Sequence, residues 1–427
     1  MVVSRYSWKD GVELPEHTRR KHKILREYFS RYLAVRCAFP QQTKFRLAIV
    51  DGFAGGGLYK CRSPGSPLIF IEELRAAADG FNLKRTTDGM SPLDIECFLV
   101  LNDLEQETID ILKSNVEPLL AVIKAEVPKL HVQVVYYQKP FEALYPEIKR
   151  LLDQGRYQNV LFNLDQYGYG DVEIMTLADI SMSFASAECF YTFMISSLLS
   201  FLSKSNRELL ARQLDFLGIT ETDLSSFEGV MSKNEWLGAA ERIVFEVFRR
   251  CARFVSPFSI NNPDGWRYWL IHLANNYRAR QEYNNVLHQN SSMQAHFGRS
   301  GLNMLTFDPT HGEGALYLFD VSGRGAAKQQ LLEDVPPLVA EFGDAISVEQ
   351  FYGSIYNMTP AHMDDIHAAI MENPDLEVLT ETGGERRKAN TIRVSDTLRL
   401  KPQRTFFPIF GLNKKANCRI CGSSSNR

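Results

Sequence analysis

A short apolar run that ends in an acid and a glycine-rich loop constrains this chain most. Residues 47–50 are apolar, Asp51 follows, and Gly52, Gly55 and Gly57 come directly after it. Glycines at such a point let the backbone approach a ligand, as in the first strand-to-helix turn of nucleotide-binding α/β folds. The spacing differs from G-x-G-x-x-G, and the lysine and hydroxyl of a P-loop are absent. We therefore expect a nucleotide-type site that favours neither NAD nor ATP.

Apolar segments alternate with helical patterns through the first part of the chain. Strands are expected at 45–50, 94–101, 131–137, 159–164 and 188–196, and helices at 16–36, 68–78, 104–120 and 141–153. Ser66 and Pro67 are expected as the cap and first position of the second helix. Residues 268–273 are expected to add an antiparallel final strand. This order predicts an α/β fold with a doubly wound, mostly parallel, Rossmann-like sheet and ligands at the carboxyl edge.

An S-adenosylmethionine site of the class I methyltransferase type fits these strand ends. Asp51 is expected to accept hydrogen bonds from the loop or, through water, from the ammonium of the cofactor. Asp103 is placed for the ribose hydroxyls, and its alternative role is the N-cap of the following helix. Phe141 and Glu142 either flank the adenine or form an ordinary core-and-surface pair. The predicted cofactor-binding residues are Asp51, Gly52, Phe53, Gly55, Gly57 and Asp103.

The segment Asp165, Gln166 and Tyr167 follows the fourth expected strand, where amino-methylating enzymes hold their acceptor. There a side-chain oxygen accepts hydrogen bonds from the target amine, and an aromatic ring stacks on a flat substrate. Methyl transfer depends mainly on in-line placement, because the sulfonium is already activated. We expect all three residues to be catalytic by orientation; the alternative is a turn with a structural tyrosine.

These segments resemble the three-Cys-motif partner proteins (TcmP), which have a methyltransferase-like domain. The similarity spans about residues 8–310 and rests on segments 16–28, 50–59, 65–68, 164–168, 268–271 and 298–309. It implies a methyltransferase-like fold and a three-cysteine, radical-S-adenosylmethionine-like partner protein. The chain departs from the family at Gln166, where a proline is usual.

Several polar residues are candidates for substrate contacts. Lys21 and His22, with His17, lie at near-helical spacing and are expected to hold a phosphate or other anion; the alternative is a solvated basic helix start. Tyr59 belongs to the segments that resemble the family. No metal site is expected, because His272, His296 and His311 lack ligand spacing and Cys418 with Cys421 forms only half of a zinc knuckle.

The C-terminal part has a different composition. Helices at 348–356 and 360–372, strands at 376–380 and 391–399 and a charged turn at 383–390 predict a winged-helix-like module, with 383–388 as its wing. Residues 383–415 contain nine Lys or Arg against two Asp or Glu, a net charge of +7. We expect Arg386, Arg387 and Lys388 to contact DNA or RNA phosphates. The alternatives are a solvated basic surface and a protein-docking module.

Composition sets the remaining limits. The 427-residue chain has a net charge of −3 and seven scattered cysteines, and it shows no signal peptide or membrane-spanning stretch, so a cytoplasmic protein is expected. The predicted units are a methyltransferase-like domain at 1–330 with a helical insertion at about 204–253, a basic module at 335–412 and a flexible tail at 413–427.

The leading predicted function is methyl transfer from S-adenosylmethionine to an amine of nucleic acid or a nucleic-acid-linked substrate, within a phage- or defence-associated modification system. One alternative is a non-catalytic, cofactor-binding partner subunit. Another is a DNA-binding protein that acts through its tail.

Overall fold

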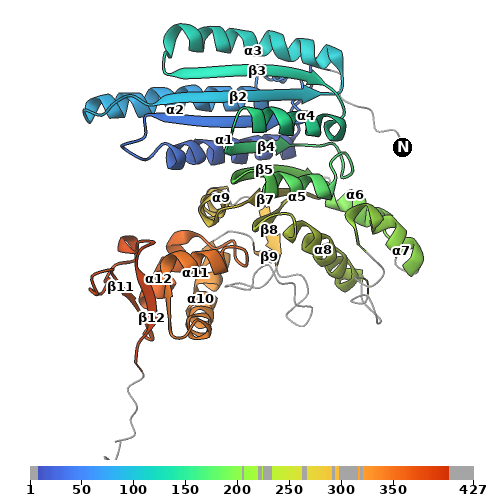
Figure 1. Cartoon of the computed structure of the whole chain (residues 1–427). Helices are drawn as coiled ribbons and strands as arrows, with labels where there is room; N and C mark the ends of the chain where they lie inside the picture. Colours follow the sequence, from blue (N-terminus) through green and yellow to red (C-terminus); the bar gives the residue numbers. More distant parts are fainter. Residues whose placement is uncertain are drawn as a thin grey trace, which may run out of the picture.

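The main sheet combines parallel and antiparallel strands. A computed structural model describes residues 8–203, 206–219, 224, 233–261, 267–290, 294–297, 316–317 and 321–402. Its strands are β1 (Lys44–Asp51), β2 (Asp94–Asp103), β3 (Leu130–Gln138), β4 (Asn159–Leu164), β5 (Ser186–Phe193), β6 (Phe254–Asn261), β7 (Arg267–Ala274), β8 (Gln294–Phe297) and β9 (Leu316–Tyr317). Within the described residues they run in the order β3-β2-β1-β4-β5-β7-β6-β8-β9 (Figure 1). The first five in this order are mutually parallel, and β7 is antiparallel to both β5 and β6.

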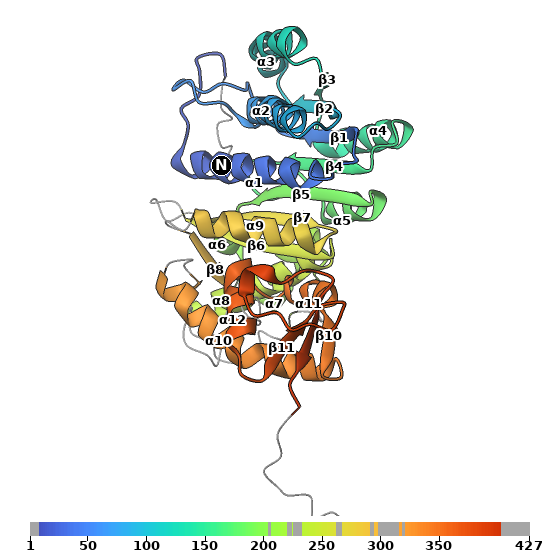
Figure 2. The same cartoon turned by 90° about the vertical axis from the view of Figure 1, so that its left-hand side faces the viewer.

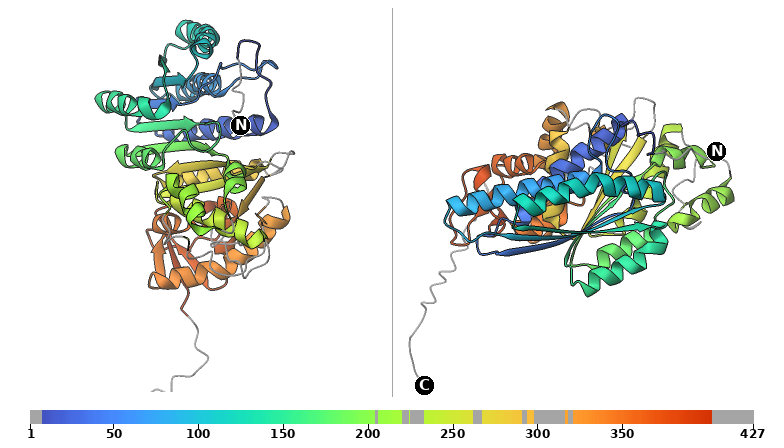
Figure 3. Two further views of the ribbon diagram at one scale, coloured as in Figure 1. Left: turned by 90° about the vertical axis from the view of Figure 1, so that its right-hand side faces the viewer. Right: turned by 90° about the horizontal axis from the view of Figure 1, so that it is seen from above.

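Helices cover both faces of this sheet (Figure 3). They are α1 (Glu16–Arg36), α2 (Ser66–Thr87), α3 (Gln106–Glu126), α4 (Phe141–Gln154), α5 (Ile174–Ser183), α6 (Ile195–Phe201), α7 (Arg207–Leu214), the 3-10 turn η1 (Asp215–Leu217), α8 (Lys233–Arg249) and α9 (Tyr277–Gln289). Alternate residues of β1 point to opposite faces: Leu47 and Ile49 pack with α1, α2, α3 and α9, whereas Ala48 and Val50 pack with α4, α5 and α8. Both faces are buried, which is why β1 is almost continuously apolar.

A smaller C-terminal module, residues 321–402, packs beside β6, β7 and α9 (Figure 2). It contains α10 (Val321–Glu341), β10 (Ala345–Ser347), α11 (Val348–Ile355), α12 (Met363–Glu372), β11 (Leu376–Leu379), η3 (Ala389–Thr391) and β12 (Thr397–Leu400). Its antiparallel sheet has the order β10-β12-β11.

Polar side chains of α9 hold the connection between α11 and α12. The Asn284 Nδ2 group donates to the Thr359 carbonyl at 3.1 Å, and Gln281 Nε2 donates to Tyr356 Oη at 2.6 Å. His288 Nε2 lies 3.0 Å from the Pro360 carbonyl oxygen. These buried contacts fix the module against the main sheet.

Several expected boundaries were wrong. The cap of α2 is Gly65, and Ser66 already belongs to the helix. The strand expected at 188–196 ends at Phe193, where α6 follows. The strand expected at 391–399 is reduced to β12, because buried Asp396 accepts the Arg393 N–H at 2.8 Å and turns the chain. The helix expected at 360–372 begins only at Met363, with His362 as its cap.

Two further expectations concern membrane spans and the end of the chain. No helix among the described residues is long and apolar enough to cross a membrane. The expected tail at 413–427, with Cys418 and Cys421, lies outside the described residues, and so do Arg299 and His311.

Candidate functional site

The carboxyl ends of three parallel strands bring the predicted acids together. Asp51 of β1 is in register with Leu101 of β2 on one side and with Asn163 of β4 on the other. Asp103 ends β2, and Asp165 follows β4. The structure therefore gathers Asp51, Asp103 and Asp165 at one edge of the sheet, as the sequence predicted.

The glycine loop after β1 is tied to its neighbouring strands by hydrogen bonds. The Gly52 N–H donates to the Asn163 carbonyl at 3.0 Å, and the Ala54 N–H donates to the Asn102 carbonyl at 2.8 Å. The side-chain amide of Asn102 also donates to the Gly52 carbonyl at 3.0 Å. The loop is consequently held in one shape before any ligand arrives.

The glycines of this loop make close approaches to the protein's own side chains. Gly55 and Gly57 have φ values of 60° and 82°, a region that disfavours side chains. A Cβ atom on Gly55 would lie 2.6 Å from Trp8, and one on Gly52 would lie 2.8 Å from Phe141 and Leu164. Trp8 thus covers the loop where the cofactor was expected, and no motif in the sequence indicated this contact.

Asp103 is linked to the loop as well as to the start of α3. Its Oδ2 accepts the Gly55 N–H at 3.1 Å, and its Oδ1 accepts the Glu105 N–H at 3.2 Å. Burial raises the pKa of Asp103, although these backbone donors oppose the shift. The N-cap of α3 is Glu105, so the alternative role of Asp103 as that cap is wrong.

Asp51 is completely buried beneath the loop. Neither of its carboxylate oxygens has a partner in good hydrogen-bonding geometry. Burial raises the pKa of Asp51 to about 7, although the nearby side chains of Ser66 and Asn163 and the N–H of Phe53 oppose the shift. A carboxylate that is poorly satisfied inside a protein favours a proton, a donor or a cation beside it.

Lys21 on α1 forms an ion pair with Asp165, its ammonium donating to Asp165 Oδ1. The Lys21 side chain is buried, and Asp165 is partly covered. Burial favours the neutral form of Asp165, but Lys21 outweighs it and holds the pKa of Asp165 below its ordinary value. Lys21 is therefore paired with a carboxylate of the protein itself, and its expected contact with a phosphate or other anion of a substrate stays a prediction.

His22 lies beside this pair and is neutral at physiological pH. Burial lowers its pKa to about 4, and its Nδ1 atom is buried without a hydrogen-bond partner. Lys21, His22, Asn163, Asp165 and Thr192 are among the residues around a cavity of about 10 Å³, which is room for about one water molecule. A neutral imidazole brings no positive charge to an anion but can donate a hydrogen bond, and the anion contact expected of His22 stays a prediction.

Gln166 and Tyr167 have separate roles in the structure. The Gln166 amide donates to Tyr191 Oη at 2.6 Å and to the Thr192 carbonyl at 3.2 Å, and its oxygen accepts the Asp171 N–H at 2.9 Å. Gln166 thus points into the protein and fixes the 165–171 loop. Tyr167, two residues after Asp165, is 51% exposed.

The remaining candidates are Phe53, the pair Phe141 and Glu142, and Tyr59. Phe53 is half-buried and packs on Phe141, with ring centroids 6.0 Å apart. Phe141 itself is a core residue, and Glu142 accepts hydrogen bonds from Glu173 and Thr176, so this pair has the ordinary role. Tyr59 stands next to Trp8 and His22, with ring centroids 5.1 and 5.7 Å away.

Arg386, Arg387 and Lys388 belong to the C-terminal module, away from the carboxyl edge (Figure 1). Arg386 forms a two-point ion pair with buried Asp396, at 2.9 and 3.0 Å, and this fixes the turn between β11 and β12. Arg387 and Lys388 are exposed.

Sequence reasoning missed the contribution of Asn163. It is a buried polar residue within an otherwise apolar strand, and its side-chain nitrogen lacks a hydrogen-bond partner. A single amide near the end of such a strand was the available signal. For a metal there is no comparable signal, since the described residues contain no group of three or more His, Cys, Asp or Glu that could hold one.

Comparison with known proteins adds little. No protein-family model and no curated protein matches the chain. Among solved structures, the crystal structure of SCL7 from Oryza sativa is similar over 64% of this chain and 74% of that chain, with 12% identity and a TM-score of 0.28.

Proposed function

We propose that the carboxyl edge of the sheet binds S-adenosylmethionine and that the chain transfers its methyl group to an amine held at Asp165. The acceptor proposed is an amine of nucleic acid or of a nucleic-acid-linked substrate. The strand order supports this proposal, because the sheet is mostly parallel and residues 268–273 form the antiparallel strand expected of a class I methyltransferase sheet, here between β5 and β6. Ligands of such open α/β sheets bind at the carboxyl edge.

Asp51 is the observation that carries the proposal. A completely buried carboxylate with poorly satisfied oxygens lies directly under the glycine loop. The ammonium of S-adenosylmethionine, reached through the loop or a water molecule, would compensate its charge. Asp103 is half-buried next to the same loop and suits the ribose hydroxyls.

Asp165 would orient the acceptor amine. The bound cofactor supplies an activated methyl group, so the protein needs mainly to position the amine. The Asp165 carboxylate already accepts a hydrogen bond from a nitrogen group of the protein, the Lys21 ammonium. An acceptor amine would have to displace Lys21, and the exposed ring of Tyr167 would stack on a flat acceptor. Release of Lys21 would also free a positive charge beside an anionic substrate.

The C-terminal module is proposed as the contact to DNA or RNA. Its order α10, β10, α11, α12, β11 and β12 is consistent with a winged helix, whose wing would carry Arg387 and Lys388. Helix α12 is acidic in its first turn, at Asp364 and Asp365, and therefore does not suit a phosphate-lined groove. In this proposal the wing makes the phosphate contacts.

A second candidate is a non-catalytic, cofactor-binding partner subunit of a three-cysteine protein. The engagement of both Gln166 and Lys21 in internal contacts favours it, because neither side chain is available to a substrate in the free protein. Both candidates bind the cofactor at the same site, but only the first transfers its methyl group.

Calorimetric titration with S-adenosylmethionine and S-adenosylhomocysteine tests the shared site. We expect micromolar binding that is lost in Asp103→Ala and retained in Asp110→Ala, which removes an exposed acid of α3. A folded protein that binds neither molecule would contradict both candidates. Methyl transfer to DNA or RNA fragments then separates them: product that Asp165→Asn abolishes supports the enzyme, and binding without product supports the partner subunit.

A further inference from the structure

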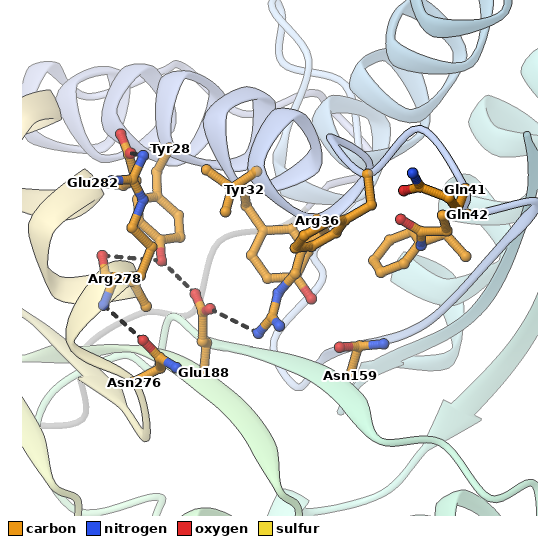
Figure 4. Close-up of a pocket in the computed structure, with 14 residues that line it drawn as sticks. Tyr28, Tyr32, Arg36, Gln41, Gln42, Asn159, Glu188, Asn276, Arg278 and Glu282 are labelled. Atoms are coloured by element: carbon orange, nitrogen blue, oxygen red, sulfur yellow. Dashed lines mark hydrogen bonds and ion pairs between the residues drawn. The ribbon is translucent and has the colours of Figure 1, made fainter. Parts of the chain in front are cut away.

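A second cavity, of about 640 Å³, opens at the opposite edge of the sheet (Figure 4). It lies where β1, β4 and β5 begin, between the end of α1 and the start of α9. Its volume is in the range of small-molecule sites. Ligands of the carboxyl edge cannot reach it, because the full length of the strands separates the two edges.

One wall of this cavity is aromatic. Tyr32 and Phe45 lie with ring centroids 6.5 Å apart, and Phe39 stands at the mouth with 67% of its surface exposed. The loop that carries Phe39 is held by buried Arg85, whose guanidinium donates to the Phe39 carbonyl at 2.7 Å and to the Pro40 carbonyl at 3.3 Å. Phe39 is therefore presented to solvent by a fixed backbone, which suits stacking with a flat ligand.

Two buried polar atoms in the cavity wall have no partner in good hydrogen-bonding geometry. They are Oη of Tyr32, a residue that is only 4% exposed and has the Arg36 guanidinium nearby, and Oε1 of Gln42. The neighbouring Tyr28 hydroxyl, one helical turn away, is by contrast bonded to Glu188 (Figure 4). Unsatisfied buried polar atoms are costly, and a ligand with hydrogen-bonding edges would satisfy them.

The charged side chains that line the cavity are two arginines and two glutamates. Arg36 lies 3.8 Å from Glu188, and Arg278 lies 2.7 Å from Glu282, which Arg31 also contacts at 3.2 Å from outside the lining. The side-chain charges of the wall therefore balance. The N-terminus of α9, a 13-residue helix, begins at the same wall and adds its partial positive charge.

We propose that this cavity binds a nucleoside monophosphate, with its base against Tyr32 and Phe39 and its phosphate toward Arg278 and Arg36. The amides of Gln41, Gln42, Asn159 and Asn276 line the cavity and match the mixed donor and acceptor edges of a base. A simple aromatic acid would leave these amides unused. The proposal is independent of the cofactor proposed for the carboxyl edge.

Titration of the full chain with adenosine and cytidine monophosphates tests this site, with adenosine and inorganic phosphate as separate probes. We expect at least one monophosphate to bind more tightly than either separate probe. Phe39→Ala and Arg278→Gln should each weaken binding about tenfold, the typical loss for one stacking or charged contact. Both residues are on the surface, so the variants should fold. Matched controls are Phe342→Ala, another exposed phenylalanine, and Arg75→Gln, another surface arginine.

The outcomes separate this cavity from the carboxyl edge. Saturating S-adenosylhomocysteine should leave monophosphate binding unchanged. Competition between the two, equal losses in the pocket and control variants, or no binding at millimolar concentration would each overturn the proposal. Inorganic phosphate that binds as tightly as the monophosphates would overturn the assignment of a base.

Discussion

The two edges of the main sheet differ in how they are filled. At the carboxyl edge, Trp8 covers part of the glycine loop and Lys21 pairs with Asp165, and the cavity beside this pair has room for about one water molecule. At the amino edge there is a cavity of about 640 Å³, and the Tyr32 hydroxyl in its wall has no partner in good geometry. Among the described residues, the edge with the sequence motif is thus filled in part by the chain's own side chains, whereas the edge without a motif keeps a large cavity.

This difference shows that a ligand would act differently at each edge. At the carboxyl edge it must displace internal contacts, so part of its binding free energy is spent on breaking the Lys21–Asp165 pair. At the amino edge it would satisfy atoms that have no partner in good geometry. Substitutions at the first edge should therefore change stability strongly, and those at the second should change mainly ligand binding.

The largest expected effect comes from breaking the ion pair at the carboxyl edge. Asp165→Ala leaves the buried Lys21 ammonium without its counter-charge and should lower the free energy of unfolding by about 3 kcal/mol. Lys21→Met combined with Asp165→Leu should recover most of this loss, because no lone charge remains. Urea denaturation measures both, and Arg278→Gln at the amino edge, a half-exposed group, should cost less than about 0.5 kcal/mol. Equal losses at the two edges would contradict the comparison.

Asp51 gives an effect of similar size, and it depends on pH. Its pKa is raised to about 7, so the folded protein binds a proton there that the unfolded chain releases near its ordinary pKa of 3.8. Stability should therefore fall as pH rises from about 4 to 7 and then level off. Asp51→Asn should remove this slope and raise the free energy of unfolding by about 4 kcal/mol at pH 8, but not at pH 4. If the free energy of unfolding depended on pH equally in the variant and the wild type, folding would not raise the pKa of Asp51.

Local patterns in the sequence predicted the elements that form the site. The helix at 16–36 and the strand at 159–164 have the bounds that their periodicity indicated, and the acids do converge at the strand ends. Each of these depends on neighbouring residues: the apolar spacing of a helix or the buried run of a strand. The expected antiparallel strand near 268–273 is likewise present as β7.

The contacts that decide how the site is filled could not be predicted in this way. Lys21 and Asp165 are 144 positions apart, and Trp8, which precedes α1 in the chain, contacts the loop that follows β1. Such pairs depend on how whole elements pack, for which one sequence carries no local signal. The amino-edge cavity has the same origin, since α1, the 39–42 loop, β5 and α9 each supply part of it.

Gln166 offers a smaller effect that sharpens the carboxyl-edge description. Its side chain makes three hydrogen bonds that hold the 165–171 loop. Gln166→Leu should lower the free energy of unfolding by about 1 to 3 kcal/mol, because the buried Tyr191 hydroxyl loses its partner. Tyr191→Phe in the same background should restore part of that loss. If Gln166 were instead a substrate contact, the variant would keep full stability and lose only acceptor binding.

The smallest effect distinguishes two tyrosines on successive turns of α1. Tyr28 donates its hydroxyl hydrogen to Glu188, so Tyr28→Phe should cost about 1 kcal/mol of unfolding free energy. Tyr32 has a buried hydroxyl with no partner in good geometry, only the nearby Arg36 guanidinium, so Tyr32→Phe should cost clearly less than Tyr28→Phe. The same Tyr32 variant should weaken monophosphate binding at the amino edge, because the hydroxyl is then missing where a ligand would satisfy it. Denaturation and titration of the two variants side by side measure this. An equal loss of stability in Tyr32→Phe and Tyr28→Phe would mean that the Tyr32 hydroxyl already makes a full hydrogen bond. The contrast between the two edges of the sheet would then be wrong.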